Sequence, residues 1–301
     1  MTMNPKLSLG PVLFYWPRDT LFDFYAQAAE MPVDIIYLGE TVCSKRRSLG
    51  SKDWIELAAR LSRQSDKEIV LSTLALIEAE SELKTLRRLC DNGRFMIEAN
   101  DIGAVRILSK KGIPFATGPG INIYNSASLD LLASKGLKRW VLPIELSNQT
   151  LRQIQLRRPE GIETEVFCYG RMPLTLSARC FTARSHNLPK DDCQYKCIDY
   201  PDGRLLSTQE QQPFLALNGI QTVSAKTCNL LPELPLLKEL QVDILRISPQ
   251  STHTGKIIDA FHKALLNQGA SDLGKYMPLG PCNGYWHGVD GQAELNSSGN
   301  R

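Results

Sequence analysis

Short apolar runs alternate with amphipathic stretches along most of this chain. The apolar runs are rich in Ile, Val, Leu and Phe, a composition typical of strands buried on both faces of a parallel sheet. The runs that predict strands span residues 7–15, 34–39, 68–75, 94–99, 114–118, 139–146, 163–169 and 242–248. Helical periodicity predicts helices over 20–30, 52–63, 78–90, 101–110, 126–135, 148–157 and 254–266. We expect capping side chains at Asp19, Ser51, Asp101, Asn125 and Ser147.

The number and order of these elements favour an α/β protein with a (β/α)8, TIM-barrel-like architecture. An open, doubly wound sheet shows the same alternation, because sequence pattern does not reveal whether a sheet closes. The absence of Gly-x-Gly-x-x-Gly after the first predicted strand makes this alternative the weaker one.

One interval, residues 171–241, is too long for a simple loop in a compact domain. It holds a Pro201-Asp202-Gly203 turn and short apolar runs at 213–217 and 220–224. We therefore expect an insertion after the seventh strand, with its own hairpin, seated on top of the barrel. The rest forms a single barrel domain over 1–287. The polar stretch 288–301, rich in Gly, Ser and Asn, predicts a flexible tail.

Composition adds a limit on the class of protein. Of 301 residues, 43% are hydrophobic and 22% charged, as in ordinary soluble globular proteins. The formal charge of +3 and the scattered basic doublets do not favour nucleic acid as a partner. Neither a signal peptide nor a transmembrane segment is apparent, so we expect a cytoplasmic protein. In that reducing compartment, its cysteines are expected to be core residues, metal ligands or catalytic thiols rather than disulfides.

Four of the eight cysteines follow predicted strands at the same end of the expected barrel. Cys43 lies just beyond the second strand, and Cys180, Cys193 and Cys197 lie in the insertion beyond the seventh. Because the carboxyl ends of all barrel strands face one side, these thiols are expected to face one another. Four thiolates at one point would repel, and a bound cation or cluster resolves that repulsion. The remaining cysteines are better explained as buried structural residues: Cys90, Cys168, Cys228 and Cys282.

The cysteine spacing leaves two kinds of metal centre open. Structural zinc sites usually combine two close cysteine pairs, and here only Cys193 and Cys197 form such a pair. An iron–sulfur cluster tolerates widely separated ligands, because the cluster itself spans the distance between them. A cluster with four protein ligands keeps no iron open to activate a substrate. It would therefore transfer electrons or hold the fold together.

Polar side chains follow several other predicted strands, where a barrel places its ligand site. They are Glu40, Asn100, Asp101, Asn122, Tyr124, Asn125, Glu145 and Arg171. Asp101 and Asn125 are equally well explained as helix caps. Glu145 stands between Ile144 and Leu146, and a carboxylate there needs a partner. Arg171 is expected to bind an anionic ligand or to pair with Glu145.

The chain lacks the usual hydrolase signatures. Neither His-Glu-x-x-His nor Gly-x-Ser-x-Gly occurs. Three of its segments nevertheless resemble the collagenase-like (U-type) peptidase family: DIIYLGETVCSKRR, GPGINIYNSASLDLLASKGLKRWVLPIELS and GRMPLTLSARC. With the cysteine spacing and the PCNGYWHG ending at 281–288, they are similar to the members of that family that serve oxygen-independent ubiquinone biosynthesis.

This resemblance implies a 4Fe-4S cluster held by Cys43, Cys180, Cys193 and Cys197. It further implies a heterodimer with a homologous cluster protein resembling UbiU, and a UbiT-like lipid-binding accessory protein. The implied activity is oxygen-independent ring hydroxylation, with prephenate or a ubiquinone precursor as the small molecule. Peptidase activity is not implied for this chain, because no residue set for peptide cleavage is recognisable.

Three hypotheses follow for the chain. In the first, it is the redox subunit of an anaerobic hydroxylase complex, and a small anionic ligand binds near Glu145, Asn122, Tyr124, Asn125 and Arg171. In the second, it is a non-catalytic subunit whose zinc or cluster site pins the insertion to the barrel. The third is a hydrolase.

Overall fold

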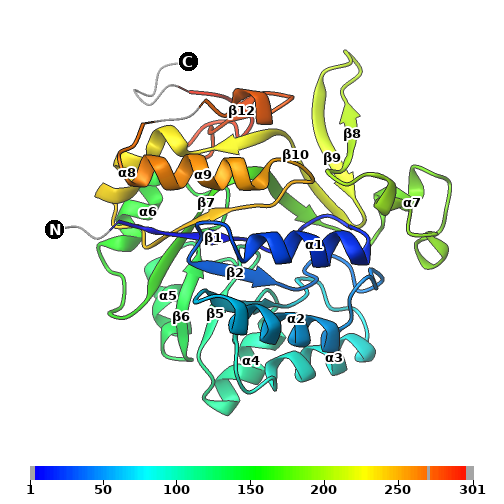
Figure 1. Ribbon diagram of the computed structural model, residues 1–301, viewed down its shortest axis with the longest axis horizontal. Coiled ribbons are helices and arrows are strands. Elements are labelled where there is room, and N and C mark those ends of the chain that lie inside the picture. The colour runs from blue at the N-terminus through cyan, green and yellow to red at the C-terminus, as the bar shows by residue number, and fades with distance from the viewer. Residues whose placement is uncertain (1–3, 270–271, 296–301) are drawn as a thin grey trace.

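A closed ring of eight parallel strands forms the centre of the computed structural model, which describes residues 4–269 and 272–295 (Figure 1). The strands are β1 (Lys6–Leu9), β2 (Ile35–Leu38), β3 (Glu68–Ser72), β4 (Met96–Ala99), β5 (Phe115–Thr117), β6 (Leu137–Val141), β7 (Glu163–Leu176) and β11 (Ile244–Ile247). Neighbours in the chain pair in parallel, and β11 pairs with both β1 and β7, which closes the ring. The predicted (β/α)8 barrel is confirmed, and the open sheet was the wrong alternative.

Helices follow the barrel strands and cover the outside of the ring (Figure 1). They are α1 (Arg18–Ala28), α2 (Ser51–Gln64), α3 (Glu80–Cys90), α4 (Ile102–Lys111), α5 (Ser126–Ala133), α6 (Asn148–Gln155), α8 (Leu234–Glu239) and α9 (Thr254–Leu265). Asp101, Asn125 and Ser147 cap α4, α5 and α6 with their side chains. The other two expected caps were wrong, because Pro17 and Gly50 stand at the N-cap positions of α1 and α2.

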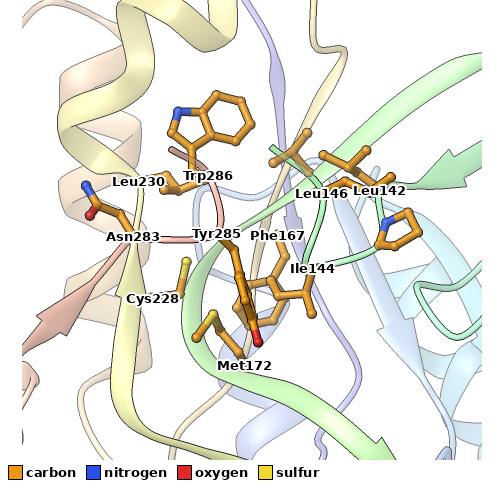
Figure 2. A pocket seen from close by; sticks show the side chains of 12 residues that line it. Leu142, Ile144, Leu146, Phe167, Met172, Cys228, Leu230, Asn283, Tyr285 and Trp286 are labelled. Carbon is orange, nitrogen blue, oxygen red and sulfur yellow. The ribbon is translucent and has the colours of Figure 1, made fainter. Parts of the chain in front are cut away.

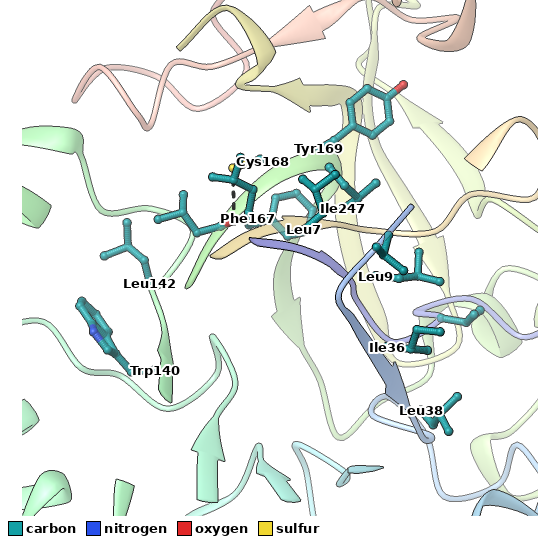
Figure 3. Close-up of a cluster of buried hydrophobic side chains, with 14 of the residues drawn as sticks. Leu7, Leu9, Ile36, Leu38, Trp140, Leu142, Phe167, Cys168, Tyr169 and Ile247 are labelled. Carbon is teal, nitrogen blue, oxygen red and sulfur yellow. Dashed lines mark hydrogen bonds between the residues drawn. The ribbon is translucent and has the colours of Figure 1, made fainter. Parts of the chain in front are cut away.

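The strand side chains divide between two environments. Those that point outward form the larger apolar core with the helices, and Figure 3 shows part of it, including Leu7, Leu9, Ile36 and Leu38. Those that point inward are mixed, because Tyr37 and other apolar residues share the barrel interior with buried charged groups. Each buried charge needs a partner inside the protein. The paired charged groups of the barrel interior lie beneath the cavity of the candidate site.

The interval predicted as an insertion forms antiparallel strands that extend the barrel sheet beyond the ring. β7 continues past the barrel and pairs with antiparallel β10 (Gln221–Asn229), which pairs with β9 (Pro213–Asn218). β8 (Arg204–Ser207) completes a hairpin with β9 that projects from the body (Figure 1). The connection from β7 to β8 holds α7 (Phe181–Arg184) and the 3-10 helices η1 (Lys190–Asp192) and η2 (Lys196–Asp199). Three further short elements are η3 (Leu231–Glu233), η4 (Gly274–Tyr276) and β12 (Pro281–Cys282), which pairs with β10.

Several boundaries differ from the sequence prediction. β1 ends at Leu9 and β6 ends at Val141, before the predicted ends at 15 and 146. The apolar residues that follow each strand belong to loops at the carboxyl end of the barrel. α8 was missed, since it is short and has a proline near its start. Within the expected tail, Leu295 is buried and its backbone pairs with the Asn283 side chain at 2.8 Å in both directions. The last residues of that tail, 296–301, lie outside the described residues.

Candidate functional site

Four cysteines from two distant parts of the chain form what we call the cysteine site: Cys43, Cys180, Cys193 and Cys197. Cys43 lies in the loop after β2, and Cys180 occupies the N-cap position of α7. Cys193 follows η1 directly, and Cys197 lies within η2. All four are free thiols; Cys197 is buried and the other three are half-buried. The insertion therefore supplies three members of the site and the barrel supplies one.

The ionisation of Cys197 shows how near these thiols are to one another. The pKa of the Cys197 thiol is raised to about 11; burial is the largest cause, Arg46 opposes it, and the charges of Cys180, Cys43 and Cys193 contribute to the rise. Such an effect requires the three sulfurs to lie near that of Cys197. Among the described residues, however, no three His, Cys, Asp or Glu side chains are grouped tightly enough to hold one metal ion. The four thiols are thus neighbours without being in the contact that a single ion demands.

Backbone N–H groups are directed at two of the sulfurs. The N–H of Ala183 donates to Cys180 Sγ over 3.3 Å, at the start of α7. Burial raises the pKa of the Cys43 thiol, and a hydrogen bond from the backbone of Lys45 opposes that rise. Donors of this kind favour a thiolate over a thiol. The local backbone is therefore suited to sulfur in its charged or ligating form.

The backbone between Cys193 and Cys197 is strained. Gln194 and Tyr195 have φ angles of 48° and 54°, in the left-handed region that non-glycine residues seldom adopt. Two such residues in succession cost on the order of 1–3 kcal/mol each, and they persist only where surrounding contacts impose them. The contacts described next hold this loop in place.

Arg46 supplies a buried positive charge behind the cysteine site. Its side chain is 1% exposed, and its Nη1 donates to the backbone oxygen of Leu13 at 3.0 Å and to Glu40 Oε1 at 3.3 Å. Glu40 Oε1 also accepts the N–H groups of Val42 and Cys43, so it fixes the loop that carries Cys43. The charge of Arg46 lowers the pKa of both Cys43 and Cys197, against the larger effect of burial. Arg46 thus favours negative charge on the sulfurs.

Asn218, at the end of β9, connects this arginine to the insertion. Its Oδ1 accepts from Arg46 Nη2 at 2.6 Å, and its Nδ2 donates to the backbone oxygens of Cys197 at 2.9 Å and Tyr200 at 2.8 Å. The residue is fully buried. One amide side chain therefore sets the distance between the loop of Cys197 and the loop of Cys43.

A second connection runs along the surface of the molecule. Lys45 Nζ lies 2.6 Å from Asp191 Oδ1 and 2.9 Å from the backbone oxygen of Lys190. Lys190 Nζ in turn lies 2.5 Å from Glu78 Oε2 in the loop after β3. Exposed ion pairs stabilise only slightly, but these two position the segment that precedes Cys193 over the barrel loops.

A cavity of about 300 Å³ lies at the carboxyl end of the barrel beside the cysteine site. Thr41 and Val42 line it, and Cys43 is the next residue. Of the expected ligand residues, Asn122 and Glu145 line the cavity, and so does Asn100, which the sequence also placed at a strand end. Tyr124 is outside the lining but donates its hydroxyl to Glu145, and burial together with that carboxylate raises the pKa of Tyr124 to about 12.

The other two expected ligand residues lie elsewhere. Asn125 Oδ1 accepts the N–H of Ser128, which is the capping role considered from the sequence. Arg171 does not line the cavity. It is half-buried on β7, burial lowers its pKa, and its Nη1 has no partner within the part of the chain that the structure describes.

Sequence reasoning missed the charged floor of the cavity. Arg246 of β11 donates from Nη1 to Glu98 Oε1 at 2.7 Å and from Nε to Glu165 Oε1 at 2.8 Å. Burial alone would raise the pKa of Glu165, but Arg246 brings it below its usual value. A signal was present, because each of these residues interrupts a predicted apolar strand, and such a charge needs an internal partner.

A smaller pocket adjoins the cavity, and it shares Ile144 and Phe167 with it. Figure 2 shows Tyr285 and Trp286 of the C-terminal segment among the side chains that line it. Its volume of about 20 Å³ is close to what one water molecule requires. The larger cavity is therefore the one with room for an organic ligand.

Comparison with known proteins places the chain in a family. The sequence model of peptidase family U32 matches residues 22–268, which is most of the chain. The chain belongs to peptidase family U32. In the described residues of this U32 protein, no helix has the length and apolar character needed to cross a membrane.

This U32 chain is also similar to solved structures at low sequence identity. Dihydropteroate synthase from Stenotrophomonas maltophilia has 11% identity and a TM-score of 0.46, over 89% of this chain and 95% of that one. Orotidine 5'-phosphate decarboxylase from Pyrococcus horikoshii OT3 has 10% identity and a TM-score of 0.42, over 84% and 98% of the two chains.

Proposed function

We propose that this U32 chain is a UbiV-type iron–sulfur subunit of a heterodimer with a UbiU-like homologue. In this proposal the complex is needed for oxygen-independent ring hydroxylation in ubiquinone biosynthesis, and the cluster serves electron transfer. The observation that supports it most is the proximity of Cys43, in the loop after β2, to the cysteines of the insertion, because Cys43 is far from them in the sequence.

The donor set suits a 4Fe-4S cluster better than a single zinc ion. Four free thiols are present, but only Cys193 and Cys197 form a close pair in the sequence, whereas structural zinc sites usually combine two such pairs. A four-iron cluster is larger and takes one thiolate at each of its corners. Cys43, Cys180, Cys193 and Cys197 would hold it, and when bound it supplies one-electron transfer.

The protein's own groups would tune such a centre. Arg46 places a buried positive charge beside sulfurs that become negative when they ligate. The N–H groups of Ala183 and Lys45 donate to two of those sulfurs. Charge and hydrogen bonds of this kind set the reduction potential of iron–sulfur centres. The proposal thus gives Arg46 a role in setting the potential rather than in catalysis.

The proposed partners come from the family resemblance. They are the UbiU-like subunit, a UbiT-like lipid-binding protein, and prephenate or a ubiquinone precursor as the small molecule, in the cytoplasm. Asn122 and Glu145, which line the cavity next to Cys43, are the ligand contacts we retain. The proposal includes no peptidase activity, because the sequence carries no peptidase motif.

A second candidate function is a non-catalytic subunit with a structural metal site, either zinc or a cluster. It is favoured by the contacts of Lys45 with Asp191 and of Arg46 with Asn218, since both attach the insertion to the barrel. Under this alternative, the metal would add a third attachment at the same place.

One experiment separates the two candidates. The chain is co-expressed with its UbiU-like partner without oxygen, and ubiquinone is measured in cells that carry Cys193→Ser. The redox proposal predicts that ubiquinone is lost while the heterodimer still forms. Normal ubiquinone synthesis with a cluster-free variant would contradict electron transfer and favour the structural role.

A further inference from the structure

A groove adjoins the barrel cavity on the surface of the molecule. Its volume is about 410 Å³, and it passes the start of α4 and the side of α5. Four residues line both the groove and the cavity, namely Ala75, Asn100, Gly120 and Asn122. Because the two spaces share this border, one elongated ligand can occupy both.

Beyond this border, apolar side chains form most of the groove wall. Ile102, the first residue of α4, is 62% exposed, and Leu131 of α5 is 59% exposed. Ile121, Ile123 and Leu132 complete the apolar wall. Single exposed apolar residues are common on protein surfaces, but several along one groove mark a binding site.

Polar groups that a ligand can reach lie at the cavity end instead. Glu145 lines the cavity. Asn100, at the border, is 7% exposed, and its Nδ2 donates to the backbone oxygen of Thr73 at 3.0 Å, which holds the amide in place. In the groove, the Oδ1 of Asp101 already accepts the N–H of Gly103 at 2.6 Å. The cavity therefore offers polar contacts, and the groove offers mainly apolar ones.

A ligand that fills both spaces explains the groove better than a protein partner does. Specific protein–protein interfaces bury about 800 Å² on each side, whereas the apolar wall of the groove consists of five side chains. A small molecule in the cavity has the groove as its direct continuation. The cavity volume of about 300 Å³ is at the lower end of the range for small-molecule sites and suits a single ring.

We propose that the barrel binds an amphiphilic molecule whose polar ring occupies the cavity and whose aliphatic chain lies in the groove against Ile102 and Leu131. This ligand differs from the small anion that the sequence suggested, because it has an apolar part that extends beyond the barrel mouth. The inference adds a subsite to the cavity of the proposed function. It concerns the cavity and the groove alone, so it stands whether or not the cysteine site holds a cluster.

Phenol and 4-hexylphenol test the proposal, because they share the polar ring and differ only in the chain. Binding of each to the full-length protein, purified without oxygen, is measured by calorimetry and ligand-observed NMR. Each methylene group that leaves water strengthens binding, so we expect 4-hexylphenol to bind about tenfold or more tightly than phenol. No binding of 4-hexylphenol near its solubility limit, or binding no tighter than that of phenol, overturns the proposal.

Variants of the groove show where the chain lies. Ile102→Glu and Leu131→Glu each place a carboxylate in the groove, and both positions are exposed, so the fold should be kept. Each should weaken 4-hexylphenol binding about fivefold or more and leave phenol binding unchanged. Leu156→Glu is the matched control, because Leu156 is 75% exposed and does not line the groove. If both groove variants bind 4-hexylphenol as tightly as Leu156→Glu does, the assignment of the chain to the groove is wrong.

Variants of the cavity show where the ring lies. Ile144→Trp and Thr175→Trp each add side-chain volume to the cavity lining, so both are expected to weaken the binding of phenol and of 4-hexylphenol. Two positions are used so that a folding defect in one variant, seen by circular dichroism, leaves the other informative. Unchanged binding of both probes to a folded cavity variant overturns the assignment of the ring to the cavity.

Discussion

Arg46 and Asn218 are 172 positions apart in the chain, and their buried side chains meet at 2.6 Å. Arg46 belongs to the loop that carries Cys43, and Asn218 holds the loop that carries Cys197. The two residues therefore fix, through one hydrogen bond, the relative position of cysteines contributed by the barrel and by the insertion. The cysteine site depends on this contact as much as on the cysteines themselves.

Removal of the Asn218 side chain is expected to destabilise the protein. Asn218→Ala removes one acceptor of Arg46 Nη2 and the acceptor of the Tyr15 N–H, and it removes one of the donors to the carbonyls of Cys197 and Tyr200. Each unmet buried group costs about 1–3 kcal/mol of unfolding free energy. Urea denaturation measures the loss. Asn122→Ala is the control because Asn122 is exposed, and an equal loss in both variants would contradict the role assigned to Asn218.

The charged floor of the cavity is expected to be sensitive to the loss of its cation. Arg246→Met leaves Glu98 and Glu165 as buried carboxylates without their partner. Breaking a buried ion pair in this way costs about 3–5 kcal/mol. Thermal and urea unfolding measure the change.

Arg152→Met provides the comparison for this prediction. Arg152 pairs with Glu239 at 2.7 Å, and both side chains are about half exposed. Its replacement should change the unfolding free energy by no more than about 1 kcal/mol. If Arg246→Met were as stable as Arg152→Met, the buried network would have no stabilising role.

Stability should fall in acid because of Glu165. Burial raises and Arg246 lowers the pKa of this carboxyl, and the net result is a pKa below the ordinary value of 4.5. A carboxyl with a lowered pKa stabilises the folded state above its ordinary pKa, and that contribution is lost as the pH falls through the folded pKa. Urea unfolding from pH 7 to pH 3 should therefore show a decline that begins below about pH 4.5.

The isosteric variant Glu165→Gln shows whether that decline belongs to Glu165. Its overall stability should be lower, and its acid-dependent decline should be weaker than that of the parent. Glu239→Gln removes an exposed carboxylate and should leave the decline unchanged. An identical pH profile for Glu165→Gln and the parent would refute the assignment.

The proposed cluster predicts a difference between two groups of cysteines. Cys43→Ser and Cys193→Ser should lose most of the bound iron, because each removes one of the four proposed ligands. Cys90→Ser should retain it, since Cys90 lies buried at the end of α3 and outside the cysteine site. Iron content and visible absorbance of anaerobically purified protein measure this. Equal iron content in all three variants would contradict the proposal that the cysteine site binds the iron.

The barrel strands could be predicted from the sequence, because each one depends on a local run of apolar residues. Buried parallel strands give continuous apolar runs, and all eight barrel strands appeared as such runs. The common direction of the strands then placed Cys43 on the same side as the insertion. Both inferences need only the order of elements along the chain.

The polar interior could not be predicted, because its partners are distant in sequence. Arg246 and Glu98 are 148 positions apart, and only closure of the ring brings them together. Arg171 illustrates the same limit. Its position after a predicted strand suggested the ligand site, but β7 continues past it, and residues 173–176 of that strand line the cavity whereas Arg171 does not.

The central claim is that four distant cysteines together hold an iron–sulfur cluster. Iron, acid-labile sulfide and zinc should be measured together in the full-length protein purified without oxygen. The account predicts about four iron and about four sulfide per chain, with little zinc. Stoichiometric zinc without sulfide would contradict it.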